Sequence, residues 1–179
     1  LGKIIQKIEG ITKQLDGSLN HNMKTPYDDP ALSFMAHMFR KDIERANKSL
    51  KEGHVDYSQG ILRASISYCI ACHTRTKEGT EFPVLAAFTD SFKTASWIDK
   101  IELEAATRQF DGVLKDVIGE FKSKKKSKVP PLELERAAEV ALAIAVRVKK
   151  DPTQADSLIN AIVNSPSAIF SLKQAAKSW

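Results

Sequence analysis

Apolar residues recur at helical spacing over most of the chain. Between residues 31 and 50 the apolar positions are three or four apart, which is the stripe of an amphipathic helix: Leu32, Met35, Phe39, Ile43, Ala46 and Leu50. Pro30 suits the first turn of a helix, and Gly53 suits a residue that ends one. The pattern therefore predicts a helix over 31–50 that ends at Gly53.

The same reasoning predicts further helices on both sides of this one. We expect a short amphipathic helix at 4–15 and a helix at 57–76 that is apolar almost all round and therefore buried on most sides. The stretch KEGTEFP at 77–83 should break it. The later predictions are helices at 84–92, 97–121 (with a break near 110–112), 131–149, 152–163 and 167–178. Asp151 and Pro152 form a cap and a first helical position for the helix at 152–163.

No segment has the period of two that a half-buried strand would show. We therefore predict an all-α protein of about seven helices, arranged as an antiparallel bundle or an irregular array of helix hairpins. Helix–turn–helix stretches in the second half weakly resemble tetratricopeptide-like hairpins, although the turns do not recur at that family's fixed repeat length.

Composition and charge narrow the class of protein. The chain has 179 residues, enough for one domain with a sizeable core or for two small ones, and no apolar run is long enough for a membrane span. It begins at Leu1, so we expect a processed or trimmed form whose targeting signal is gone. The net charge is +5, and five lysines gather at 122–128. No aromatic residue is interleaved with them and no nucleic-acid-binding motif accompanies them, so we expect a solvated linker and no nucleic-acid binding.

The chemistry concentrates in SYCIACHTR at 67–75, which holds both cysteines of the chain, Cys69 and Cys72, followed at once by His73. Three kinds of site fit such a cluster. A structural zinc site needs a second pair of ligands, and the sequence has no second CxxC or HxxxH motif. A dithiol redox site usually sits at a helix N-terminus beside a strand, whereas this pair lies near the end of a predicted helix.

The third kind is covalent haem, for which C-x-x-C-H is the attachment motif. Two thiols can add to the two porphyrin vinyl groups as thioethers, and the adjacent histidine can bind the iron. On a helix, the directions of Cys69, Cys72 and His73 fall within about 100° of one another, so all three can address one flat group. The motif therefore favours one covalently bound haem c.

CIACHTRTK resembles the haem-attachment segment of c-type cytochromes. With Lys77 four places after His73 in an all-helical chain, it is most similar to the four-helix-bundle class, the cytochromes c prime. In that class the motif lies in the last helix, whereas here residues 74–179 follow it. The resemblance implies thioether roles for Cys69 and Cys72, an axial-ligand role for His73, and attachment of the haem outside the cytoplasm, hence a periplasmic or exported protein.

The sixth iron position has few sequence candidates: His21, Met23, Met35, His37, Met38 and His54. If the helices at 31–50 and 57–76 run antiparallel, position n faces about 108 minus n, which puts Met35 level with His73. Met35 and Met38 are therefore the distal candidates, and both could equally be core residues. Phe34, Phe39, Tyr57 and Tyr68 could line the haem pocket or the bundle core, while His37 and His54 suit the surface.

These observations predict a monohaem c-type cytochrome that transfers single electrons to a redox partner protein, with a haem-binding region at 1–92 and a helical companion at 93–179, or one domain of both. Two alternatives stay open. One is a haem-based gas or redox sensor with an open distal site, and the other is a haem-free helical interaction module whose CxxC is a thiol pair. No hydrolase, metalloprotease, P-loop or dinucleotide motif is present, so we do not expect an enzyme.

Overall fold

The computed structural model describes residues 1–21, 29–75 and 94–179, with the side chains of 18–21 excluded. All regular structure in these ranges is helical, which confirms the all-α prediction. The described chain divides into two compact units, Leu1–Cys72 and His73–Trp179. The predicted helix at 84–92, the breaker at 77–83, Lys77 and the predicted boundary between 92 and 93 lie outside the described residues.

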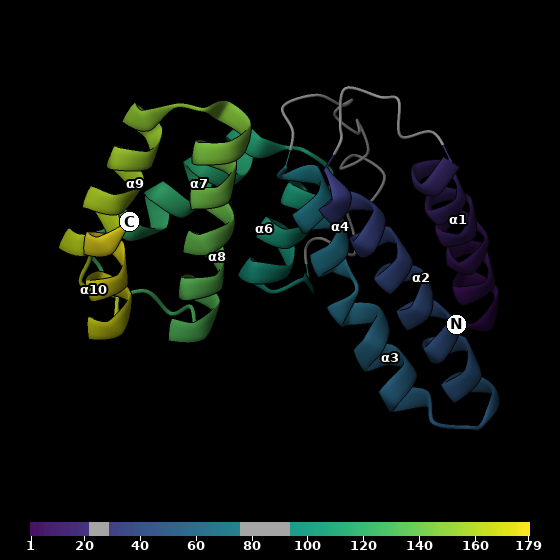
Figure 1. Ribbon diagram of the computed structural model, residues 1–179. Helices are drawn as coiled ribbons and strands as arrows, with labels where there is room; N and C mark the ends of the chain where they lie inside the picture. The colour runs from purple at the N-terminus through teal and green to yellow at the C-terminus, as the bar shows by residue number, and fades with distance from the viewer. Residues whose placement is uncertain (22–28, 76–93) are drawn as a thin grey trace. The chain divides into compact units, whose positions relative to one another are not determined.

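The first unit is built around α2 (Pro30–Lys51), which packs against α1 (Gly2–His21) and against α3 (Val55–Ala64) (Figure 1). A buried line on α2, formed by Ala36, Ile43 and Ala46, supplies the contact surface. The predicted end of this helix is confirmed. Gly53 adopts a φ of 87° and donates to the Leu50 carbonyl, while the amide of His54 donates to the Ser49 carbonyl. These two bonds are those of a Schellman motif, which needs a left-handed residue.

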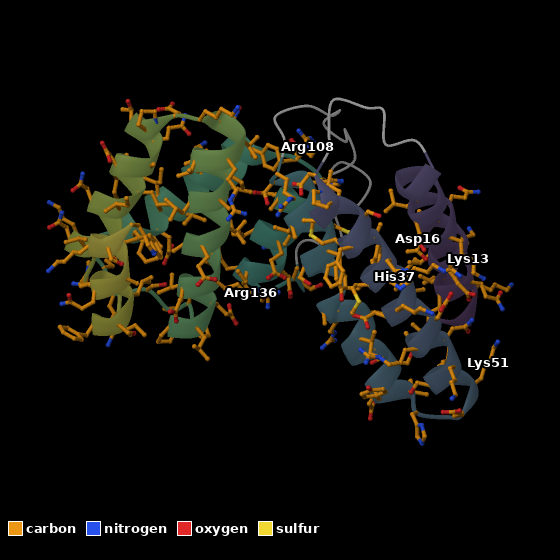
Figure 2. All side chains as sticks on the ribbon, viewed as in Figure 1. Lys13, Asp16, His37, Lys51, Arg108 and Arg136 are labelled. Carbon is orange, nitrogen blue, oxygen red and sulfur yellow. The ribbon has the colours of Figure 1, made fainter. Side chains whose placement is uncertain are left out.

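The α1–α2 contact combines apolar and polar side chains. Asp16, buried on α1, accepts a hydrogen bond from Arg40 at 3.1 Å and lies 3.6 Å from the Nδ1 atom of His37 (Figure 2). Asn47 on α2 donates to the carboxylate of Glu9 at 2.6 Å. The buried face of α1 therefore holds the apolar Ile5 together with the polar Thr12 and Asp16, while Ile4 and Ile11 are exposed.

The helix predicted at 57–76 is two helices, α3 and α4 (Ile66–His73), separated at Ser65. The expectation that this stretch is buried on most sides is wrong for α3, where the buried residues Ser58 and Ile61 lie on one side and Tyr57 is exposed. Residues 68–75, in and just after α4, are all buried or half-buried. Helix α3 packs against α2, which covers one face of it.

The second unit comprises α6 (Trp97–Ala106), α7 (Phe110–Lys122), α8 (Pro131–Ala143), the π-helix η2 (Ile144–Lys149), α9 (Pro152–Asn164) and α10 (Phe170–Ser178). Helix α9 packs against α7 and α10, and α6 packs against α7 and α8. The core of the unit contains Val113, Val117 and Phe121 of α7 together with Leu158 and Ile162 of α9.

Two differences from the predicted helices of this unit have local causes. The helix expected at 97–121 breaks at 107–109, just before the expected place, where Arg108 takes a φ of 65°. The helix expected at 131–149 changes from α to π at Ile144 and ends at Lys150, which is left-handed with a φ of 51°. The predicted Asp151 cap is confirmed, because its carboxylate accepts from the amides of Thr153 and Gln154.

Candidate functional site

The CxxCH residues lie at the end of α4, where Cys69, Cys72 and His73 are all half-buried. The two sulfurs are not joined in a disulfide. One short helix therefore carries all three side chains, as the sequence pattern predicted. The boundary between the two units falls between Cys72 and His73.

Within the first unit, Tyr68 fixes α4 on α2. Its ring stacks on Phe39 with centroids 5.6 Å apart, and its hydroxyl donates to Asp42 at 2.8 Å. Further along, the Ser58 hydroxyl donates to the Ala46 carbonyl at 2.9 Å. These contacts follow the antiparallel register predicted for α2, in which position n faces about 108 minus n. Tyr68 thus holds the helix in place one residue before Cys69.

His73 makes its described contacts within the second unit. Its Nδ1 atom lies 2.6 Å from the carbonyl oxygen of Ala106, and its own carbonyl accepts from Arg108 Nη1 at 3.0 Å. A carbonyl oxygen only accepts hydrogen bonds, so Nδ1 must carry the proton. In the neutral imidazole, Nε2 is then the nitrogen with the lone pair, and a second bond of this kind is what orients most metal-bound histidines.

The surroundings keep this imidazole neutral and the first thiol protonated. Burial lowers the pKa of His73, and the positive charge of Arg108 adds to that effect, while the bond to Ala106 opposes it. Burial raises the pKa of Cys69. A nucleophilic dithiol site needs a lowered thiol pKa, so Cys69 does not have the environment of one.

No three metal-ligating side chains come together anywhere in the described ranges. A structural zinc site takes four such ligands, so the described residues contain no ligand set for zinc. A covalent haem needs fewer metal ligands from this helix, because the two thiols bind the porphyrin and only the histidine binds the iron.

The other predicted site residues are only partly brought together. Phe39 and Tyr68 stack on each other, whereas Phe34 is 65% exposed. Met35 and Met38 are half-buried on α2, and a ligand role for either stays a prediction. His37 and His54 lie at the surface, as expected, and the side chains of His21 and Met23 lie outside the described residues.

Sequence reasoning did not identify the residues that hold His73. It also did not identify two carboxyl groups of α6, of which Glu102 is buried and Glu104 is half-buried. The bond to Ala106 uses a backbone carbonyl, which every residue has, so no sequence pattern indicates it. In the sequence, Arg108 is also indistinguishable from an ordinary surface arginine. Glu102 forms an ion pair with Arg136 of α8 (labelled in Figure 2), and Glu104 lies against Gly112 of α7. Burial raises the pKa of both carboxyl groups, and Asp116 adds to the effect on Glu104.

Comparison with protein-family models, curated proteins and solved structures finds no match for this chain. Within the described residues, no helix combines the length and the apolar character that crossing a membrane requires. The functional argument therefore rests on the residues of the site.

Proposed function

We propose that this protein is a monohaem c-type cytochrome that holds its haem at Cys69, Cys72 and His73. The observation that carries the proposal is the hydrogen bond from His73 Nδ1 to the Ala106 carbonyl, on a helix that also presents both thiols. That bond selects the tautomer whose Nε2 can donate a lone pair to iron. The donor set therefore fits a covalent haem.

Each residue has a definite role in the proposal. Cys69 and Cys72 would form thioether bonds to the porphyrin, and His73 would supply an axial ligand to the iron. Arg108 positions His73 by donating to its carbonyl, and Tyr68 positions α4 through Phe39 and Asp42. Met35 and Met38 remain the distal candidates of the predicted pocket.

Bound haem supplies one-electron redox chemistry, and the protein sets its potential through ligands and burial. We place the function in electron transfer to a redox partner protein outside the cytoplasm, because thioether attachment takes place there in c-type cytochromes. A gas or redox sensor differs from this only in leaving the sixth iron position open.

The test is to produce the chain in a host with c-type haem maturation and to record oxidised, reduced and pyridine-haemochrome spectra. We expect one covalent haem per chain, retained in a denaturing gel. Cys69→Ala/Cys72→Ala should lose it entirely. His54→Ala is the matched control, because this histidine is exposed in a turn and should leave the spectrum unchanged.

A colourless protein in which both thiols titrate would overturn the proposal and leave the haem-free module. Long-range proton–nitrogen NMR of the apo chain checks the tautomer of His73 separately, because it reports the Nδ1 proton without any haem. The reduced spectra of Met35→Ala and Met38→Ala then distinguish a six-coordinate carrier from a five-coordinate sensor.

The lysine block at 122–128 gives the proposed cytochrome a surface for an acidic partner. All five of its lysines are exposed, around the loop between α7 and α8. Opposite charges speed association most at low salt. Replacing Lys124, Lys125 and Lys126 by Gln should flatten the salt dependence of association with an acidic redox partner in stopped-flow kinetics, and an unchanged slope would exclude this surface.

A further inference from the structure

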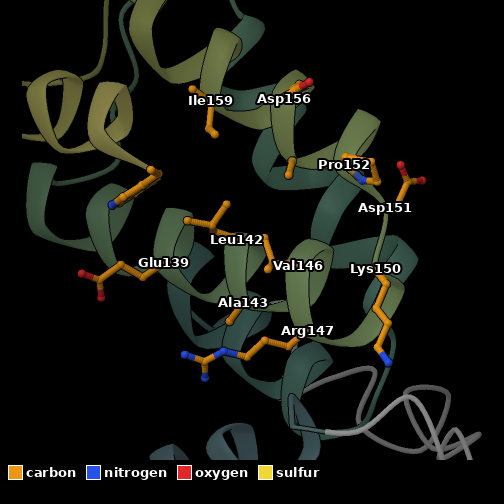
Figure 3. A pocket seen from close by; sticks show the side chains of 12 residues that line it. Glu139, Leu142, Ala143, Val146, Arg147, Lys150, Asp151, Pro152, Asp156 and Ile159 are labelled. Atoms are coloured by element: carbon orange, nitrogen blue, oxygen red, sulfur yellow. The ribbon is translucent and has the colours of Figure 1, made fainter.

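The second unit contains a groove between two helical walls that the proposed haem site does not use. Its volume is about 730 Å³. One wall is formed by α8, η2 and Lys150, and the other by the first half of α9, with Trp179 also in the lining. Figure 3 shows Leu142 and Val146 pointing toward the α9 wall and Ile159 pointing back toward them.

The residues that line each wall recur at helical spacing. Glu139, Leu142, Val146 and Lys150 are three or four residues apart, and so are Pro152, Ala155 and Ile159. At 1.5 Å per residue, the first row extends over about 16 Å, or three helical turns. Ala143 and Ala155 have small side chains and leave the space between the rows open, so a third helix can pack its own ridge there.

The rim of the groove carries charges of both signs. Arg147 and Lys150 lie at one end of the first wall and Glu139 lies at its other end, while Asp156 lies on α9. In the part of the chain that the structure describes, none of these four side chains has a hydrogen-bond or ion-pair partner, and all four are exposed. The rim is therefore open to charges brought by another molecule.

The backbone of the first wall is irregular where the groove lies. Val146 and Arg147 belong to the π-helix, and Lys150 follows it in the left-handed region. Short π segments inside α-helices occur frequently at functional sites. Val146 is 54% exposed, and Trp179 is 43% exposed. Large apolar side chains thus remain uncovered in the lining.

We infer that this groove binds an amphipathic α-helix of a partner protein. The partner helix has an apolar stripe of three turns, acidic residues where it meets Arg147 and Lys150, and basic residues where it meets Glu139 and Asp156. Helix-in-groove recognition of this kind uses anchors at i, i+3 or i+4, and i+7, and flanking charges set the orientation. The inference is independent of the haem.

The probes are two designed 15-residue helical peptides with the same leucine stripe. The first has Glu at the positions that meet Arg147 and Lys150 and Lys at the positions that meet Glu139 and Asp156, and the second has the Glu and Lys positions exchanged. Binding to the full chain is measured by anisotropy of a label on the peptide. We expect the first peptide to bind and the exchanged one to bind at least about tenfold more weakly, since a misplaced charge pair is penalised at a specific interface.

Two variants assign the binding to the groove. Val146→Asp should weaken binding of the first peptide at least about tenfold, because it puts a charge into the apolar stripe. Leu132→Asp is the matched control, since Leu132 is a 76% exposed apolar residue of α8 that does not line the groove. Glu139→Lys/Arg147→Glu/Lys150→Glu/Asp156→Lys should reverse the preference in favour of the exchanged peptide, and these exposed sites should tolerate the changes without loss of folding.

Three results would overturn the inference: no binding of either peptide, equal binding of both peptides, or binding that Val146→Asp leaves unchanged. Sedimentation of the chain alone gives a further decision. If the chain dimerises with concentration and Val146→Asp abolishes the dimer, the occupant is a second copy and not a partner helix.

Discussion

Glu104 is a carboxyl group placed where its charge is unfavourable. Its Oε2 atom is buried and has no hydrogen-bond partner within the described ranges. A Cβ added at Gly112 would come within 3.3 Å of that oxygen, so the glycine leaves the room that the carboxyl group occupies. Burial, and secondarily the charge of Asp116, raise the pKa of Glu104 above its ordinary value of 4.5. At neutral pH the residue therefore reduces the stability of the folded state.

Glu104→Gln is expected to stabilise the protein at pH 7 and to change little at pH 4. The folded pKa is raised, so the contribution of the carboxyl group is fully favourable below its unfolded pKa and is lost as pH rises through the folded pKa. The neutral amide does not undergo this loss. The measurement is the difference in melting temperature between variant and parent from pH 4 to pH 8. A difference that does not grow with pH would contradict the burial argument, and Glu139→Gln is the control because Glu139 is an exposed carboxyl of the same unit.

At the scale of the element, the C-terminus of α2 depends on one residue. Gly53 has a φ of 87°, and a Cβ there would meet no atom within 4 Å. The cost of a side chain at this position is therefore the cost of the left-handed backbone alone.

Gly53→Ala should lower the free energy of unfolding by about 1 kcal/mol, as left-handed backbone is disfavoured for residues with a Cβ. Gly60→Ala provides the matched control in α3, where a Cβ also meets nothing within 4 Å but the backbone is helical. It should raise the free energy of unfolding by about 0.5–1 kcal/mol. Urea denaturation of both variants measures the two changes, and effects of the same sign would contradict the explanation.

The elements show why some features could be predicted and others could not. Pro30, Gly53 and Asp151 act through their own backbone and nearest amides, so the sequence alone placed both ends of α2 and the start of α9. The grouping of Cys69, Cys72 and His73 is also local, because three positions on one helix fix their directions. The bond between His73 and Ala106 joins residues far apart in sequence, and nothing local indicates it. Likewise, the burial pattern of α3 depends on which side α2 covers.

At the scale of the whole molecule, the described chain consists of two compact units with separate cores. Ile43 is fully buried in the first unit, and Leu158 is fully buried in the second. Each unit therefore has its own apolar core, and a cavity made in one core should affect mainly that unit.

Ile43→Ala and Leu158→Ala should each destabilise mainly the unit that contains the substitution, by about 2–5 kcal/mol, which is the usual range for such cavities in a core. Native-state hydrogen exchange, resolved by residue, would measure this as faster opening confined to 1–72 or to 73–179. Equal acceleration in both ranges for both variants would mean that the chain unfolds as a single cooperative body.

The π-helix between α8 and α9 predicts what deletion of a single residue there would do. A π turn holds one more residue than the α-helix would place there, so deleting one residue from Ile144–Lys149 should restore a continuous α-helix. Because the π turn absorbs the extra residue, the residues after the deletion would keep their orientation relative to Leu142. Homologous chains with and without this extra residue would then share the core of the unit and differ in the groove only at the turn itself, where Val146 and Arg147 lie. A single inserted codon would thus change the side chains that the groove presents while the fold stays the same.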